Sequence, residues 1–112
     1  MNELIESSVR DIASAIRLKR VSTKEVILAF LDRINIVNPK INAIISVNAE
    51  AALKQAERAD IALANGETHG KLFGVPMTIK DSLDTFDMTT TWGTLGRKDF
   101  RPSKDATCTA RL

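Results

Sequence analysis

The chain has 112 residues, a formal net charge of +2, and contents of 44% hydrophobic and 27% charged residues. This length supports one small domain with a modest core, and the composition is ordinary for a globular protein. The near-balanced charge argues against a nucleic-acid partner, and no apolar run is long enough to span a membrane. A single cysteine cannot form an internal disulfide, and the segment 1–6 lacks the apolar run of a signal peptide. We therefore expect a cytoplasmic protein with no nucleic-acid or membrane partner.

Two amphipathic helices are predicted first. Ser8 is a start signal for one of them, and Ser22 with Glu25 forms a capping box for the other. The second helix is predicted to end at Asn38, because the residue before Pro39 avoids the helical region. The expected apolar stripes are formed by Val9, Ile12, Ala13 and Ile16, and by Val26, Ile27, Phe30, Leu31 and Ile34. The two helices are predicted to pair as a helical hairpin.

A strand and a third helix are predicted next. Residues 41–47 alternate between apolar and polar side chains, while Ile44 makes both faces apolar and indicates burial on two sides. Asn48 is the expected cap of an alanine-rich helix that runs to about Asn65, with Gly66 as its C-terminal stop. So many alanines leave little side-chain bulk, so this helix can approach a neighbour closely.

A short strand ending in Lys80 is predicted over residues 75–80. Alternation places Val75, Met77 and Ile79 on one face, and the chain then turns at once. Lys80 would lie at the carboxyl end of a strand, where ligands gather in open α/β sheets. A lysine that is partly desolvated there can lose its proton near neutral pH and act as a base. The alternative is a strand-end lysine that extends into water.

The remainder is predicted to be irregular as far as Pro102, with one short helical turn. A helix is then expected to start at Ser103 or Asp105 and to continue to Leu112 without a stop signal, which predicts that the natural chain extends further.

Other reactive side chains give weaker patterns. Cys108 is expected to be a small buried thiol and His69 a solvated loop residue, and together they give no metal-ligand spacing. Trp92 is expected either to line a pocket or to anchor a packed loop. Three aspartates lack the glycine and the final glutamate of a calcium loop: Asp81, Asp84 and Asp87.

Several short motifs occur in order between Lys71 and Leu112. They are Leu72, Gly74-Val75-Pro76, Ile79-Lys80-Asp81, Met88, Thr90-Thr91, Gly93, Asp105-Ala106-Thr107 and Ala110-Arg111-Leu112. Together they resemble the opening of the amidase signature family, and Asn38 to Ala43 and the run 48–66 are similar to its N-terminal helices. The resemblance implies an α/β fold with a mixed sheet flanked by helices. Residues 1–112 would be its N-terminal portion, with 1–66 as a mainly helical lead-in and 67–112 as the start of the catalytic core.

The resemblance also implies a chemistry, namely hydrolysis of a small-molecule carboxamide without a metal or organic cofactor. In the family a neutral lysine accepts a proton through a bridging serine held in a cis peptide, and a second serine attacks the carbonyl. Lys80 falls on that catalytic lysine. The family's serines lie in a downstream Gly/Ser-rich segment that does not occur here, and Ser82 and Ser103 lack its glycine-rich setting. The 112 residues would supply the base and not the nucleophile, so they are expected to be inactive alone.

The match has local departures, and other functions remain open. Thr94 and Asp87 stand where the family often has serine and a small residue. Asp81 matches the family's aspartate and is expected to be structural, facing away from Lys80. One alternative within the family is the glutaminase component of a tRNA-dependent amidotransferase. Another is a truncated, non-catalytic binding or assembly module, which would melt cooperatively by itself, whereas a fragment would not.

Overall fold

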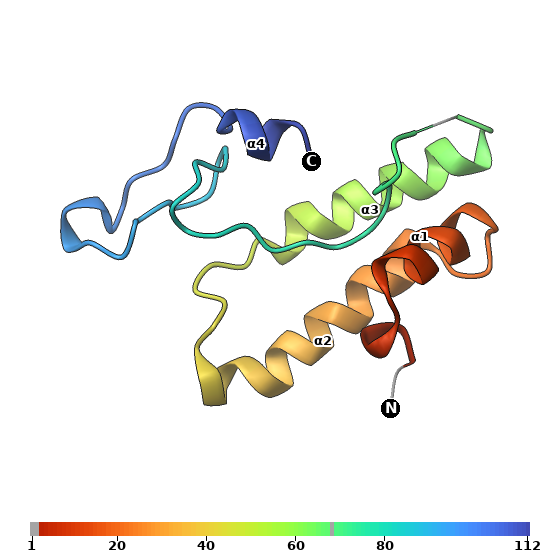
Figure 1. The fold of residues 1–112 in the computed structure, drawn as a ribbon, viewed down its shortest axis with the longest axis horizontal. Helices are drawn as coiled ribbons and strands as arrows, with labels where there is room; N and C mark the ends of the chain where they lie inside the picture. The colour runs from red at the N-terminus through yellow and green to blue at the C-terminus, as the bar shows by residue number, and fades with distance from the viewer. Residues whose placement is uncertain (1–2, 68) are drawn as a thin grey trace. The chain divides into compact units, whose positions relative to one another are not determined.

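The computed structural model describes residues 3–67 and 69–112. The elements in chain order are η1 (Glu3–Glu6), α1 (Val9–Arg17), α2 (Thr23–Ile41), α3 (Ala49–Ala64), η2 (Leu95–Arg97) and α4 (Thr107–Ala110), as Figure 1 shows. The chain forms two compact units, Met1–Pro76 and Met77–Leu112, and each is described by itself. In the described part, no helix combines the length and the apolar character that crossing a bilayer requires.

The starts of α1 and α2 confirm the predicted caps. Ser8 Oγ accepts a hydrogen bond of 3.1 Å from the Asp11 N–H. Ser22 Oγ accepts one of 3.1 Å from the Glu25 N–H, and the Glu25 carboxylate accepts one of 2.8 Å from the Ser22 N–H. The Ser22 backbone and hydroxyl donors favour the ionised carboxylate and hold the pKa of Glu25 below its ordinary value.

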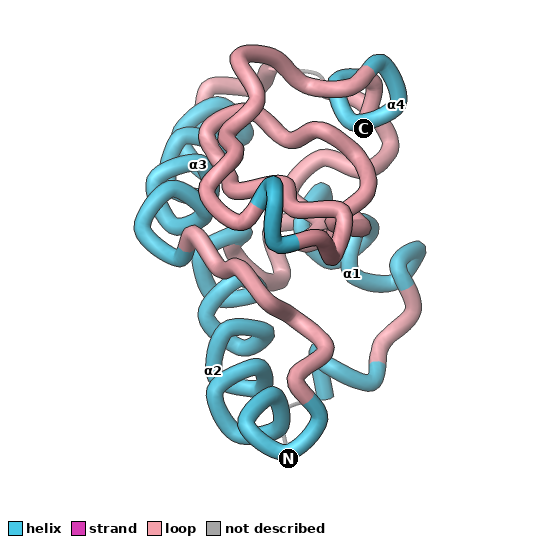
Figure 2. The backbone as a smooth tube through the Cα atoms, turned by 90° about the vertical axis from the view of Figure 1, so that its left-hand side faces the viewer, coloured by secondary structure: helices cyan, strands magenta, loops and turns pink. Residues whose placement is uncertain are grey.

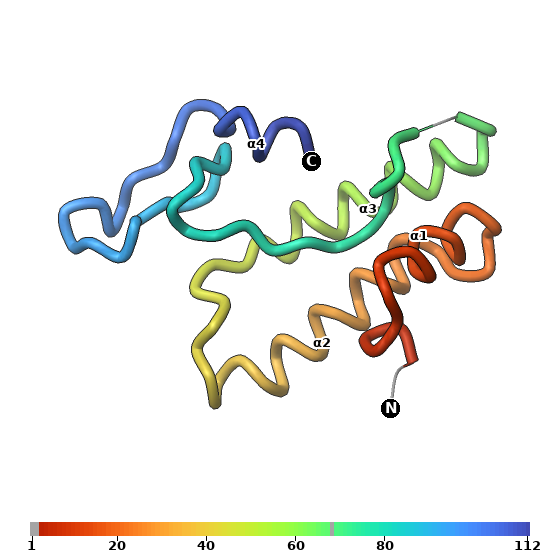
Figure 3. The backbone as a smooth tube through the Cα atoms, viewed as in Figure 1, coloured from red at the N-terminus to blue at the C-terminus, as the bar shows by residue number. Residues whose placement is uncertain are grey.

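A carboxylate from α3 also caps α2. The Thr23 N–H donates to Asp60 Oδ1 at 2.6 Å, and the Lys24 N–H donates to Asp60 Oδ2 at 3.1 Å. The two helices run antiparallel, so the start of α2 lies beside the end of α3 (Figure 3). Negative charge at a helix N-terminus is favourable, and here it also joins two helices.

Asp60→Ala is expected to lower the free energy of unfolding by about 1–2 kcal/mol, because two N–H groups of α2 lose their acceptor. Urea denaturation followed by circular dichroism measures this loss. Glu57→Ala is the matched control, since it removes an exposed ion pair with Lys24 and leaves the cap intact. Equal effects of the two substitutions would contradict the capping role.

The core of the first unit combines all three of its α-helices. The buried cluster is Ile12 and Ile16 of α1 with Val26 of α2. The partly buried side chains packed against it are Leu4, Val21, Phe30, Leu63 and Val75. Ala29 and Ala56 are also buried, one on each of two helices that pack together, α2 and α3. The predicted hairpin of the first two helices is therefore incomplete, because α3 is the main neighbour of α2.

The predicted end of α2 at Asn38 is wrong. The helix continues through Pro39 to Ile41 and ends at Asn42, whose φ of 47° is left-handed. The Asn42 N–H donates to the Asn38 carbonyl at 2.7 Å. The Asn38 side chain donates to the Ile44 carbonyl at 2.7 Å and accepts from the Ile44 N–H at 2.9 Å. These contacts hold the last turn despite the missing proline N–H.

Helix α3 confirms its predicted limits. Asn48 Oδ1 accepts from the Ala51 N–H at 3.1 Å. At the other end Gly66 has a φ of +76°, its N–H donates to Leu63, and the Glu67 N–H donates to Ala62. This pair of bonds is the Schellman motif that ends many helices.

The mixed sheet is not confirmed, because the described residues contain no strand (Figure 2). Residues 43–48 and 75–80 have no regular secondary structure. The predicted burial of 41–47 on two sides is wrong, since Ile45 and Val47 are exposed. A strand needs a neighbour to pair its backbone N–H and C=O groups, and the described part of the chain offers none to these segments.

The second unit is largely irregular, as predicted, and η2 is its short helical turn. Helix α4 begins at Thr107, later than the predicted start at Ser103 or Asp105, and it ends at Ala110 rather than continuing to Leu112. The Asp105 carboxylate instead accepts the Phe86 N–H at 2.6 Å, so it does not cap the helix.

Candidate active site

The backbone leading to Lys80 is anchored at Gly74. This glycine has a φ of +77°, and a Cβ atom there would lie 2.7 Å from Thr23 Oγ1 and 3.1 Å from Ile16 Cδ1. Val75 follows it and packs against the core cluster. The Gly-Val pair therefore lets the chain lie directly on α1 and α2 before it reaches Lys80.

Lys80 is exposed and precedes a turn, so the partial desolvation expected from the sequence is not found among the described residues. Its carbonyl accepts the Leu83 N–H at 2.9 Å, which closes a β-turn over residues 80–83. No hydrogen bond or ion pair engages its amine among residues 3–67 and 69–112. The lysine is thus placed by its backbone and its amine remains available.

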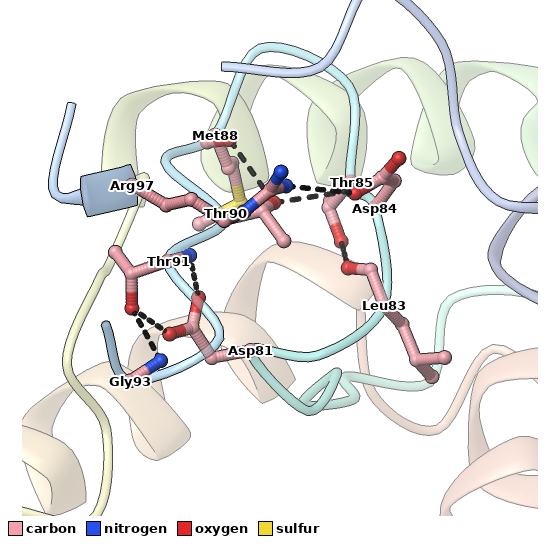
Figure 4. A network of polar contacts seen from close by, with 9 residues as sticks. All are labelled: Asp81, Leu83, Asp84, Thr85, Met88, Thr90, Thr91, Gly93 and Arg97. Carbon is pink, nitrogen blue, oxygen red and sulfur yellow. Dashed lines mark hydrogen bonds and ion pairs between the residues drawn. The ribbon is translucent and has the colours of Figure 1, made fainter. Parts of the chain in front are cut away.

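The carboxylate next to Lys80 is engaged elsewhere. Asp81 Oδ1 accepts the Thr91 N–H at 2.8 Å, and Asp81 Oδ2 accepts the Thr91 hydroxyl (Figure 4). The side-chain and backbone donors of Thr91 hold the pKa of Asp81 below its ordinary value of 3.8, with smaller help from Gly93 and Arg97. Asp81 is therefore a structural residue of the loop, in line with its predicted role.

The Thr-Thr-x-Gly motif forms the other side of this contact. Trp92 and Gly93 have φ values of 56° and 70°, and the Thr94 N–H donates to the Thr91 carbonyl at 3.1 Å. Two positive φ angles at the central residues are those of a type I′ turn. The Trp92 N–H donates to the Asp81 carbonyl at 3.2 Å, and the Gly93 N–H donates to Thr91 Oγ1 at 3.1 Å.

The Asp81–Thr91 contact is expected to be lost in acid. Because the pKa of Asp81 is lowered in the folded chain, its stabilisation is fully present above about pH 3.8 and disappears as the pH falls through the folded value. The ¹³C shift of the Asp81 carboxyl and the Thr91 amide shift should titrate together below pH 3.8. In Asp81→Asn the Thr91 amide should not titrate. A Thr91 amide that titrates equally in both proteins would contradict the assignment.

The Arg97 guanidinium contacts two aromatic rings, an arrangement that the sequence patterns did not predict. Its guanidinium carbon is 3.5 Å from the Trp92 ring centroid and 3.9 Å from that of Phe100. Asp84 Oδ1 lies 3.7 Å from the guanidinium. Trp92 nevertheless remains 58% exposed, so it is a loop contact rather than a buried anchor. The sequence signal that could have indicated these contacts is the position of Arg97 between Trp92 and Phe100 along the chain.

The other candidate residues have separate roles. Cys108 is exposed, so its predicted burial is wrong; α4 is only one turn long and buries none of its residues. The His69 ring stacks on Phe73 at 4.0 Å. The aspartates engage different partners, as Asp84 pairs with Arg97 and Asp87 with Arg101. In the described part of the chain, no cluster of three metal-ligating side chains forms.

Comparison with known proteins assigns the class. The model of the family described as Amidase matches residues 25–112. The chain belongs to this amidase family.

Among curated proteins, the chain is similar to three that are each named as the A component of glutamyl-tRNA(Gln) amidotransferase. It is 44% identical over 110 residues to that of Bdellovibrio bacteriovorus, covering 98% of this chain and 22% of the relative. It is 39% identical to that of Carboxydothermus hydrogenoformans, covering 98% and 23%, and 38% identical to that of Acidothermus cellulolyticus, covering 100% and 22%. The chain thus spans less than a quarter of the length of these relatives.

Proposed function

We propose that residues 1–112 are the N-terminal part of an amidase domain in which Lys80 is the general base for carboxamide hydrolysis. The observation that carries the proposal is the placement of Lys80, which is exposed beside a turn with its amine free of any carboxylate among the described residues. A base must be able to be neutral, which requires of a lysine that no carboxylate stabilises its charge and that it is desolvated. The first condition is met among the described residues, and we propose that the rest of the domain supplies the second. The match over residues 25–112 supports the same reading.

In the proposed reaction the neutral amine of Lys80 accepts a proton from a bridging serine, which accepts one from a nucleophilic serine. The nucleophilic oxygen attacks the amide carbonyl carbon, and the amine leaves with a proton as an acyl-enzyme forms. Water then cleaves the acyl ester, which releases the acid and restores the serine. Both serines would come from residues outside these 112, as would the strands that pair with 75–80 in a mixed sheet.

A second candidate is favoured by the names of the relatives. The three proteins compared above are named as amidotransferase components, so the amide could be that of glutamine and the released ammonia could pass to a second reaction. In that case the natural gene product would require partner proteins for full activity. A free-standing amidase would hydrolyse simple carboxamides without them.

The intact mass of the natural gene product, followed by an amide-hydrolysis assay on it, tests the proposal. We expect a mass several times the 12.3 kDa of these residues and release of ammonia from a carboxamide. A natural product of 12.3 kDa would remove the serines and overturn the amidase proposal. A cooperative melt of such a product would then favour the binding or assembly module.

A further inference from the structure

We propose that Thr91 is a positioning residue that keeps the Asp81 carboxylate away from the Lys80 amine. This inference rests on the proposed role of Lys80 as a base. It goes further by assigning a function to the polar contact across the loop, ten residues apart in the chain.

The first step of the argument is the position of Asp81. It follows Lys80 directly, so it is the carboxylate nearest to Lys80 along the chain. A carboxylate beside an ammonium favours the charged form of the lysine. For Lys80 to act as a base, the Asp81 carboxylate must therefore be hydrogen-bonded to another partner.

The second step is how Asp81 is occupied. Both of its oxygens accept hydrogen bonds from the same residue, one from the Thr91 N–H and one from the Thr91 hydroxyl (Figure 4). The hydroxyl is itself held, because its oxygen accepts the Gly93 N–H at 3.1 Å. The Trp92 N–H fixes the Asp81 backbone from the same turn. The carboxylate is thus directed toward the Thr91–Thr94 turn.

The third step concerns the other charges near this turn. Arg97 contributes a favourable charge to Asp81, but its guanidinium is engaged by Asp84 and by two aromatic rings. Among the described residues no other cation is bonded to Asp81. If the Thr91 hydroxyl were removed, Lys80 would be the adjacent cation available to the freed oxygen.

The test is competitive acetylation of lysines in the natural gene product, because only the neutral amine reacts. Lys104, which is exposed in the same unit, is the internal reference. In Thr91→Val we expect the acetylation of Lys80 relative to Lys104 to fall about two- to fivefold, the range that an exposed ion pair provides. Thr91→Ser keeps the hydroxyl and should match the unchanged protein.

A double variant separates positioning from a general disturbance of the loop. Thr91→Val combined with Asp81→Asn removes the competing charge, so the acetylation of Lys80 should recover. Unchanged labelling in Thr91→Val, or a loss that the double variant does not reverse, would overturn the inference and leave Thr91 as a loop contact. The readout needs no catalytic activity, so it is independent of whether Lys80→Ala abolishes hydrolysis.

Discussion

Among the glycine-to-alanine substitutions in this chain, Gly74→Ala is expected to be the most destabilising. It should lower the free energy of unfolding by about 2–4 kcal/mol. Two costs combine at this position. The left-handed φ of +77° is unfavourable for any residue with a Cβ atom, and that atom would lie 2.7 Å from Thr23 Oγ1. Neither Thr23 nor Ile16 can move freely, since both are buried. Urea denaturation followed by circular dichroism gives the size of the loss.

Gly66→Ala is the control that separates the two costs. Gly66 has a similar φ of +76°, and a Cβ atom there would meet nothing within 4 Å. It should show the conformational cost alone, about 1–2 kcal/mol. Thr23→Ala combined with Gly74→Ala should recover part of the excess, because the nearest clashing atom is gone. Equal losses for the two glycines would show that the close approach at Gly74 is not significant.

Lys80→Ala is expected to lower amide hydrolysis by the natural gene product about 10²–10⁴-fold, the usual contribution of a general base. Its fold should be intact, because the replaced side chain is exposed and makes no contact among the described residues that stabilises the loop. Ammonia release under substrate saturation measures the effect, and circular dichroism checks the fold.

Two further variants make the Lys80 test specific. Lys80→Arg should be equally impaired, since a guanidinium stays protonated at working pH. Lys104→Ala removes another exposed lysine and should retain full activity. Normal hydrolysis by Lys80→Ala would show that the base is a different group.

Local sequence signals predicted the helices well, because the interactions that mark where a helix starts and ends lie within one or two turns of it. The Ser22–Glu25 capping box and the Asn48 and Gly66 ends of α3 are each read from adjacent residues. The end of α2 was missed because Asn38 bonds to Ile44 and supports the turn that contains Pro39. The backbone preference of a residue before proline is a local rule, and it does not take account of such a side-chain contact.

The candidate site was predicted only in part, because local signals cannot indicate contacts between distant residues. The position of Lys80 before a turn follows from the sequence around it, whereas the Asp81–Thr91 and Arg97–Trp92 contacts join residues that are not neighbours. The strand over 75–80 shows the opposite limit. Its alternation is a property of the segment, yet pairing depends on another segment, and the described residues supply none.

The position of Trp92 in the second unit has a consequence for optical measurements. Trp92 is the only tryptophan of the 112 residues and lies in the unit Met77–Leu112, while the long helices lie in Met1–Pro76. Fluorescence and far-ultraviolet circular dichroism therefore observe different units of the same molecule. Coincident denaturation curves would mean that the two units unfold as one cooperative system, and separated curves would give the stability of each.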